Sequence, residues 1–152
     1  MTRGNARELA VHLIYAREFT REDPENVIAS RLKKDYYALL AEENQVYTDR
    51  PSGVQRSYID TVVSGVANRT EELNALIGQY SIGWDVSRIS RLARAIMQLA
   101  LFEIQYIEDV PTGVAINEAV RIAKLYDGDE AGSFINGILG SYARSLTSGE
   151  NT

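Results

Sequence analysis

Cationic side chains recur at helical spacing in two parts of an otherwise acidic sequence. The chain has 16 lysines and arginines against 21 aspartates and glutamates, a formal net charge of −5. Arg3 and Arg7 are four residues apart, so on a helix they would share a face and could contact successive phosphates. Arg88, Arg91 and Arg94 recur every three residues and predict a cationic ridge. From these facts alone, phosphate binding and solvated surface decoration are equally good interpretations.

The residue types that carry catalysis are poorly represented. His12 is the only histidine and stands between Val11 and Leu13, which indicates a partly buried packing residue rather than a metal ligand or general base. No H-E-x-x-H, G-x-S-x-G, P-loop or G-x-G-x-x-G motif occurs. Carboxylates stand within one helical turn of basic residues, as Glu18 does with Arg21, which favours solvated ion pairs. We therefore predict no enzyme, no catalytic residue, no metal site and no cofactor.

Length and composition indicate one globular domain in a reducing compartment. The chain has 152 residues, of which 45% are hydrophobic and 24% charged, as in ordinary globular proteins. It has no cysteine, and neither a signal peptide nor an apolar run long enough for a membrane span is present. We expect a cytoplasmic protein with no membrane partner. The negative net charge argues against nucleic acid coating the whole surface, but not against a local basic patch.

Apolar residues spaced i, i+3, i+4 predict an all-α protein of about seven helices. The first helix is expected to begin at Ala6, after a flexible arm of residues 1–5. A second follows Asp23-Pro24, an N-cap and a proline at the first helical position, and ends before a loop over residues 41–53. A third begins after Pro51.

Four further boundaries are predicted in the second half. Asn68 with Glu71 resembles a capping box, which separates the third helix from a fourth. Asp85 is expected to cap a fifth helix that is apolar on nearly every face, so this helix should be buried centrally. The sixth should end at Asp127-Gly128. Residues 147–152 are expected to form a flexible tail after the seventh.

The last helix contains three glycines. Gly132, Gly137 and Gly140 each lower helix propensity by about 1 kcal/mol relative to alanine, so we expect a neighbour packed too closely for a Cβ. Lys124 lies in the last turn of the preceding helix, where a cation also interacts favourably with the helix dipole.

Read together and in order, four segments resemble the NusB family of bacterial transcription antitermination factors. They are "ARELAVHLIY", "GWDVSRISRLARAIMQLALFEI", "VPTGVAINEAVRIAKLY" and "SFINGILG". The resemblance extends from Ala6 to about Leu146 at family spacing. It implies a helical fold of two small packed bundles forming a single NusB-like RNA-binding domain over residues 1–152. It also implies binding of single-stranded boxA RNA together with ribosomal protein NusE on ribosomal RNA operons, with other Nus factors and RNA polymerase as indirect partners.

The resemblance also implies site residues. The family's arginine-rich arm corresponds to Arg3 and Arg7, an aromatic after its fourth helix to Tyr80, and the first residue of its F-V-N-G motif to Phe134. Unpaired bases stack on aromatic rings while cations contact phosphates, which suits these residue types. Phe134 could equally be a core residue. Two further cations, Arg88 and Lys124, complete the candidate RNA-binding set of Arg3, Arg7, Tyr80, Arg88, Lys124 and Phe134. The candidate NusE contacts are Tyr15 and Phe19.

Two departures from the family pattern bear on its partners. The arm has only two arginines, because Thr2, Gly4 and Asn5 dilute it, so fewer phosphate contacts and a shallower salt dependence are expected. Ala93 stands where the family commonly has an acidic residue near its NusE face. Two alternative functions remain open: a self-associating structural protein, possibly a homodimer, and an accessory RNA-binding domain for ribosomal RNA methylation.

Overall fold

The computed structural model is all-helical over the residues that it describes. It describes the backbone of residues 1–84 and 89–150, and side chains up to residue 147. This part of the chain forms eight α-helices and one short 3-10 helix, with no strand. The chain divides into two compact units, residues 1–68 and 69–152. The all-α prediction is confirmed, with one more helix than the sequence indicated.

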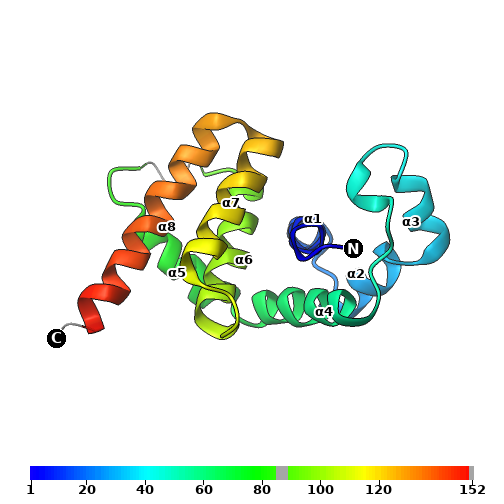
Figure 1. Cartoon of the computed structure of the whole chain (residues 1–152), viewed down its shortest axis with the longest axis horizontal. Coiled ribbons are helices and arrows are strands. Elements are labelled where there is room, and N and C mark those ends of the chain that lie inside the picture. Colours follow the sequence, from blue (N-terminus) through cyan, green and yellow to red (C-terminus); the bar gives the residue numbers. More distant parts are fainter. Residues whose placement is uncertain (85–88, 151–152) are drawn as a thin grey trace. The chain divides into compact units, whose positions relative to one another are not determined.

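The first unit is built around the contact of its first and last helices. Its elements are α1 (Arg3–Thr20), α2 (Pro24–Arg31), α3 (Lys34–Leu40), the 3-10 helix η1 (Gln45–Tyr47) and α4 (Gly53–Asn68). In Figure 1, α4 runs across α1 rather than along it, and α2 packs against both. Leu9 and Leu13 of α1 and Ile59 and Val62 of α4 are fully buried.

Helix α1 begins earlier than the sequence indicated. The Thr2 hydroxyl accepts a hydrogen bond from the Asn5 backbone N–H at 3.0 Å, which makes Thr2 a side-chain N-cap. Residues 3–5 are therefore helical, and Arg3 lies in the first turn. At the other end Arg21 adopts a left-handed conformation (φ 57°) and its N–H bonds the Arg17 carbonyl.

The segment predicted as one helix after Pro24 is two helices, α2 and α3, broken at Leu32 and Lys33. Pro24 does stand at the first helical turn of α2, but the Asp23 side chain makes no cap hydrogen bond. The predicted loop over residues 41–53 contains η1. It is held by the buried Tyr37, whose hydroxyl donates towards the carbonyls of Val46 and Asp49 at 3.1 and 2.9 Å.

The second unit surrounds one central helix. Its helices are α5 (Thr70–Tyr80), α6 (Arg91–Tyr106), α7 (Thr112–Asp127) and α8 (Asp129–Glu150). Helix α6 contacts α5, α7 and α8, and α7 and α8 lie side by side (Figure 1). Every residue from Ala95 to Glu103 is buried, so the prediction of a central helix is confirmed.

Two predicted helix caps in this unit differ from the structure. Asn68 is the last residue of α4, and Arg69 precedes α5 without a side-chain cap, so the predicted capping box is wrong. The Arg69 guanidinium instead lies 4.2 Å from the centre of the Tyr106 ring. Asp85, the predicted cap, lies outside the described residues. Helix α6 is capped by Ser90 and begins at Arg91, which is the first arginine on it.

The α7–α8 junction matches the prediction. Helix α7 ends at Asp127, and Gly128 has a positive φ of 95° that other residues rarely adopt. Of the three glycines predicted to be closely packed, only Gly132 has a very close neighbour, because a Cβ there would lie 2.7 Å from Cγ of Lys124. A Cβ at Gly137 or Gly140 would make contacts of 3.9 and 3.4 Å, so the close-packing prediction holds only for Gly132.

None of the described helices combines the length and the apolar composition that crossing a lipid bilayer requires.

Candidate nucleic-acid interface

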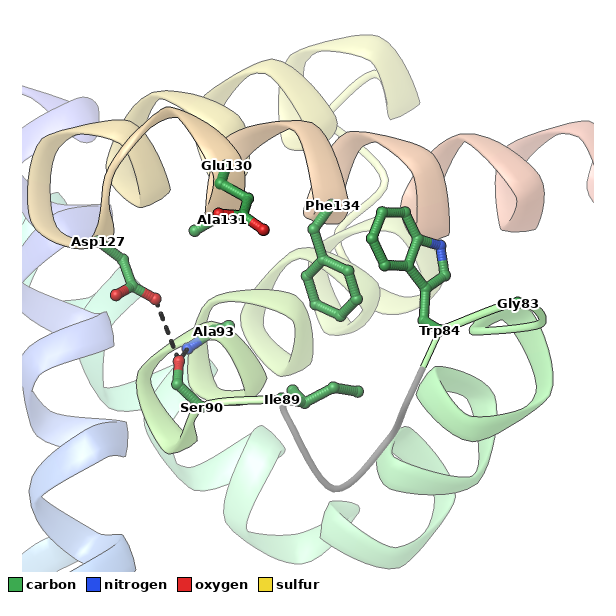
Figure 2. Close-up of a pocket in the computed structure, with 9 residues that line it drawn as sticks. All are labelled: Gly83, Trp84, Ile89, Ser90, Ala93, Asp127, Glu130, Ala131 and Phe134. Carbon is green, nitrogen blue, oxygen red and sulfur yellow. Dashed lines mark hydrogen bonds between the residues drawn. The ribbon is translucent and has the colours of Figure 1, made fainter.

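The second unit has a hollow of about 540 Å³ where α6, α8 and the segment after α5 meet. We call it the aromatic hollow, and Figure 2 shows the side chains that surround it. Apolar side chains form one part of its lining and oxygen-bearing side chains another. The lining residues are Gly83, Trp84, Ile89, Ser90, Ala93, Asp127, Glu130, Ala131 and Phe134.

Two aromatic rings form the apolar wall. Trp84 and Phe134 meet edge to face, with ring centres 4.7 Å apart and planes at 79° (Figure 2). Phe134 projects from α8 and is half-buried, whereas Trp84 is 47% exposed. A turn after α5 presents Trp84. The backbone N–H of Trp84 donates to the Ser81 carbonyl at 2.9 Å, and Gly83 has a φ of 87°. The wall therefore offers an aromatic surface to a flat ligand.

The opposite wall is polar and acidic. The Ser90 hydroxyl accepts from the Ala93 N–H at 3.0 Å and donates to the Asp127 carboxylate at 3.1 Å, so one side chain caps α6 and joins it to the end of α7. Glu130 lies beside them on α8 (Figure 2). Among the residues that the structure describes, the lining includes no lysine or arginine. Two carboxylates repel phosphate but accept hydrogen bonds from amino groups, so the aromatic hollow suits a nucleobase better than a phosphate.

Tyr80 and Lys124, two further predicted RNA contacts in this unit, are not among the residues that line the aromatic hollow. Tyr80 is the last residue of α5 rather than part of a connector; its hydroxyl bonds the Ser145 hydroxyl at 2.9 Å and its ring meets Tyr142 edge to face. Lys124 is exposed on α7, with its aliphatic stem against Gly132. Arg88 lies outside the described residues.

The structure describes two of the three arginines of the predicted ridge. Arg91 and Arg94 stand on α6, and Ile89 and Ser90 before it are not helical. Ala93, where the family often has a carboxylate, is buried and lines the aromatic hollow.

In the first unit, the two N-terminal arginines gather on one tyrosine of α4. The guanidinium carbon of Arg3 lies 4.1 Å from the centre of the Tyr58 ring, and that of Arg7 lies 6.0 Å from it. Arg3 also donates from Nε to the side-chain oxygen of Gln55 at 2.8 Å. Arg7 is only 6% exposed, so in this conformation Arg3 is the more accessible of the two charges.

The two predicted protein-contact residues lie together on α1. Tyr15 and Phe19 meet edge to face with ring centres 5.1 Å apart. Phe19 is 55% exposed and Tyr15 is half-buried. An exposed aromatic pair at the end of a helix is a feature that protein interfaces commonly use.

His12 has a packing role, as predicted. Its Nδ1 lies 2.7 Å from the hydroxyl oxygen of Tyr47, and this hydrogen bond joins α1 to η1. Burial lowers the pKa of His12, with a smaller opposing effect from Glu8. Burial also raises the pKa of Tyr47 to about 12. Among the described residues, no group of three histidine or acidic side chains is close enough to hold a metal ion.

Sequence reasoning missed two aromatic residues of the site. Trp84 was identified only as part of a family motif, although a single tryptophan in a glycine-containing connector is itself a signal of an exposed ring. Tyr58 follows the apolar spacing of its helix and gives no such signal. Its contact with Arg3 joins residues more than 50 positions apart, and only the fold brings them together.

Comparison with known proteins gives one consistent result. A model of the NusB family matches residues 4–144. The transcription antitermination protein NusB of Acetivibrio thermocellus is 42% identical over 144 residues, which cover 95% of this chain and 90% of that protein.

Solved structures agree with this at the level of the fold. T. maritima NusB has a TM-score of 0.70 and 26% identity, over 95% of this chain and 92% of that one. A chain from a crystal structure of the antitermination factors NusB and NusE in complex with dsRNA has a TM-score of 0.72. It is 20% identical, and the match covers 94% of this chain and 96% of that one.

Proposed function

Because the chain belongs to the NusB family, we propose that it is a transcription antitermination factor that binds RNA at the aromatic hollow and at Arg3. The family is one of antitermination proteins and not of enzymes, so the proposed action is binding alone. It would take place in the cytoplasm, where bacterial transcription occurs.

The observation that carries the proposal is the aromatic hollow. Trp84 and Phe134 present ring surfaces beside two carboxylates, and no lysine or arginine is among the described lining residues. A base that is already paired and stacked in a duplex is not free to enter such a hollow, whereas an unpaired base is. The ligand that fits best is therefore single-stranded RNA with one base against the aromatic wall, and the resemblance to the NusB family suggests RNA of the boxA type.

Cations outside the hollow would hold the RNA backbone. Arg3 is the more accessible of the two N-terminal arginines of the first unit, and Lys124 is exposed on α7. Arg7, being buried, would act chiefly through the position of Arg3. We keep Arg88 and Tyr80 as RNA-binding candidates, the first lying outside the described residues and the second having its hydroxyl bonded to Ser145.

Ribosomal protein NusE is the proposed protein partner. Support comes from the likeness of fold to a chain in the crystal structure of the antitermination factors NusB and NusE in complex with dsRNA. The exposed Tyr15–Phe19 pair on α1 is the proposed contact. Joint binding of boxA RNA would place the protein in antitermination complexes on ribosomal RNA operons, with RNA polymerase and other Nus factors as indirect partners.

The single tryptophan makes the hollow directly observable. Because Trp84 is the only tryptophan, its fluorescence reports on the aromatic wall without added label. We expect a boxA-type single-stranded RNA to quench this fluorescence saturably, because a base stacked at the wall contacts the indole ring. A scrambled strand and a boxA-type duplex should quench it only at much higher concentration.

The same titration can contradict the proposal. Equal quenching by the scrambled strand would remove the preference for boxA, and tighter binding of the duplex would show that the hollow does not select unpaired bases. If no RNA changes the fluorescence, the aromatic hollow is not the RNA site.

A further inference from the structure

Two residues of α4, Tyr58 and Gln55, contact the side chain of Arg3. Its guanidinium lies 4.1 Å above the Tyr58 ring centre, a cation–π distance. Its Nε donates to Gln55 at 2.8 Å. Tyr58 is itself buried, so the ring beneath the guanidinium is held by the core of the first unit. Stacking and one hydrogen bond together define both the height and the rotation of the guanidinium plane.

The contacts with Gln55 and Tyr58 do not use the Nη donors of Arg3, which can bind a phosphate. A guanidinium has five N–H donors, one on Nε and four on the two Nη atoms. Gln55 uses the Nε donor, and the paired Nη donors are those that bind a phosphate in a two-pronged manner. The first turns of α1 and α4 contain no acidic residue, so neither supplies a carboxylate that would compete with phosphate.

Arg7 adds a second charge behind the first. Its guanidinium carbon lies 6.0 Å from the same Tyr58 ring, and its side chain is buried. One tyrosine face thus collects both arginines of the N-terminal segment. The segment that the sequence predicted as a flexible arm is, from Arg3 onwards, a helical turn docked on α4.

We infer that Tyr58 and Gln55 are positioning residues that hold Arg3 ready for an RNA phosphate. The inference rests on the proposed RNA-binding function and specifies how it is achieved: the arginine is ordered before RNA arrives. Ordering a long side chain on binding weakens affinity by roughly 2- to 12-fold. An arginine whose side chain is already ordered avoids this loss.

The test is a double-mutant cycle on RNA affinity. Gln55→Ala and Tyr58→Leu should each weaken binding of boxA-type RNA by roughly 2- to 12-fold. Tyr58→Phe should retain wild-type affinity, because it keeps the ring beneath the guanidinium. In an Arg3→Ala background, Gln55→Ala and Tyr58→Leu should have no further effect. Gln45→Ala, an exposed glutamine of η1 in the same unit, is the matched control and should change nothing.

A second measurement needs no RNA. The Tyr58 ring should shift the side-chain NMR signals of Arg3 upfield through its ring current. This shift should persist in Tyr58→Phe and disappear in Tyr58→Leu. Because Gln55 is only partly buried, Gln55→Ala keeps the test valid if Tyr58→Leu unfolds the first unit.

The outcomes separate this inference from the proposed function. If the wild-type protein binds no RNA, the proposed function fails and the positioning role fails with it. If the wild-type protein binds RNA but the Gln55→Ala and Tyr58→Leu penalties persist in the Arg3→Ala background, only the positioning role is overturned. Affinity lost equally in Tyr58→Phe would likewise overturn it, because that variant retains the aromatic face.

Discussion

Phe134 serves two purposes at once, because α8 needs apolar side chains and the aromatic hollow needs a ring at its surface. The ring is half-buried, meets Trp84 edge to face and still lines the hollow. Its neighbour Ile135 is fully buried, so the adjacent core position is filled independently. The choice between core residue and RNA contact that the sequence left open is therefore not exclusive at this position.

We predict that Phe134→Ala weakens RNA binding by roughly 5- to 150-fold, the range for loss of one base–aromatic stack. Phe134→Tyr is the control that keeps the ring and should stay close to wild-type affinity. Fluorescence anisotropy with labelled boxA-type RNA measures both, after thermal unfolding has shown that each variant is folded. If Phe134→Ala binds as tightly as wild type, Phe134 belongs to the core alone.

The sequence suggested which residue types the candidate site would use, but not which neighbours position them. Arg3 and Phe134 were identified from their chemistry and from the resemblance, whereas the partners Tyr58, Gln55 and Trp84 were not assigned to the site. These partners are distant in sequence from the residues they support, and no local pattern encodes such a contact. Arg7 shows the converse, since a charge expected on the surface is buried.

His12 predicts a pH-dependent stability. Burial holds the pKa of His12 below its usual 6.5, so the unfolded chain binds a proton more readily than the folded one. The contribution of His12 to stability is fully present above pH 6.5 and is lost as pH falls, by at most about 1.4 kcal/mol per pH unit. Urea unfolding between pH 7.5 and 5 measures this.

The His12→Gln variant isolates this contribution from that of the carboxylates. It removes the titrating group, so its free energy of unfolding should fall less steeply than that of the wild type over the same pH range. Identical slopes would show that His12 does not contribute to the pH dependence.

The apolar spacing predicted well which helices exist and in what order they follow. It predicted poorly where each helix begins and ends. The central position of α6 followed directly from its composition. The predicted caps at Asp23 and Asn68 make no cap hydrogen bond, whereas Thr2 and Ser90 do. Many serine, threonine, asparagine and aspartate residues can cap a helix, and tertiary contacts decide which one does. Ser90 is a clear case, because it also bonds Asp127 at the end of α7.

The contact between α7 and α8 predicts that Gly132→Ala changes stability in opposite directions with and without the Lys124 side chain. Gly132→Ala should destabilise the wild-type protein, because the added Cβ would lie 2.7 Å from Cγ of Lys124. In a Lys124→Ala background that atom is absent, and the same substitution should stabilise α8 by up to about 1 kcal/mol. Thermal unfolding of the four proteins gives both signs. Stabilisation in both backgrounds would show that the Lys124 side chain moves aside at no cost.

At the scale of the whole molecule, the protein combines a net negative charge with few cations at its proposed RNA sites. The formal net charge is −5, and Arg3 is the accessible charge of the N-terminal pair. We therefore expect weak electrostatic attraction to RNA, and a shallow salt dependence because few phosphate contacts would form. A second protein that binds both this chain and RNA would supply the missing affinity through thermodynamic coupling.

The most direct test of this account is the affinity for boxA-type single-stranded RNA with and without purified NusE, measured by fluorescence anisotropy. We expect NusE to tighten RNA binding by roughly 5- to 150-fold, the usual range of coupling between two sites. Substitution of Phe19 by alanine should abolish the gain while leaving the affinity of the protein alone unchanged. An affinity for RNA that is the same with and without NusE would contradict the proposal that this chain holds RNA jointly with that partner.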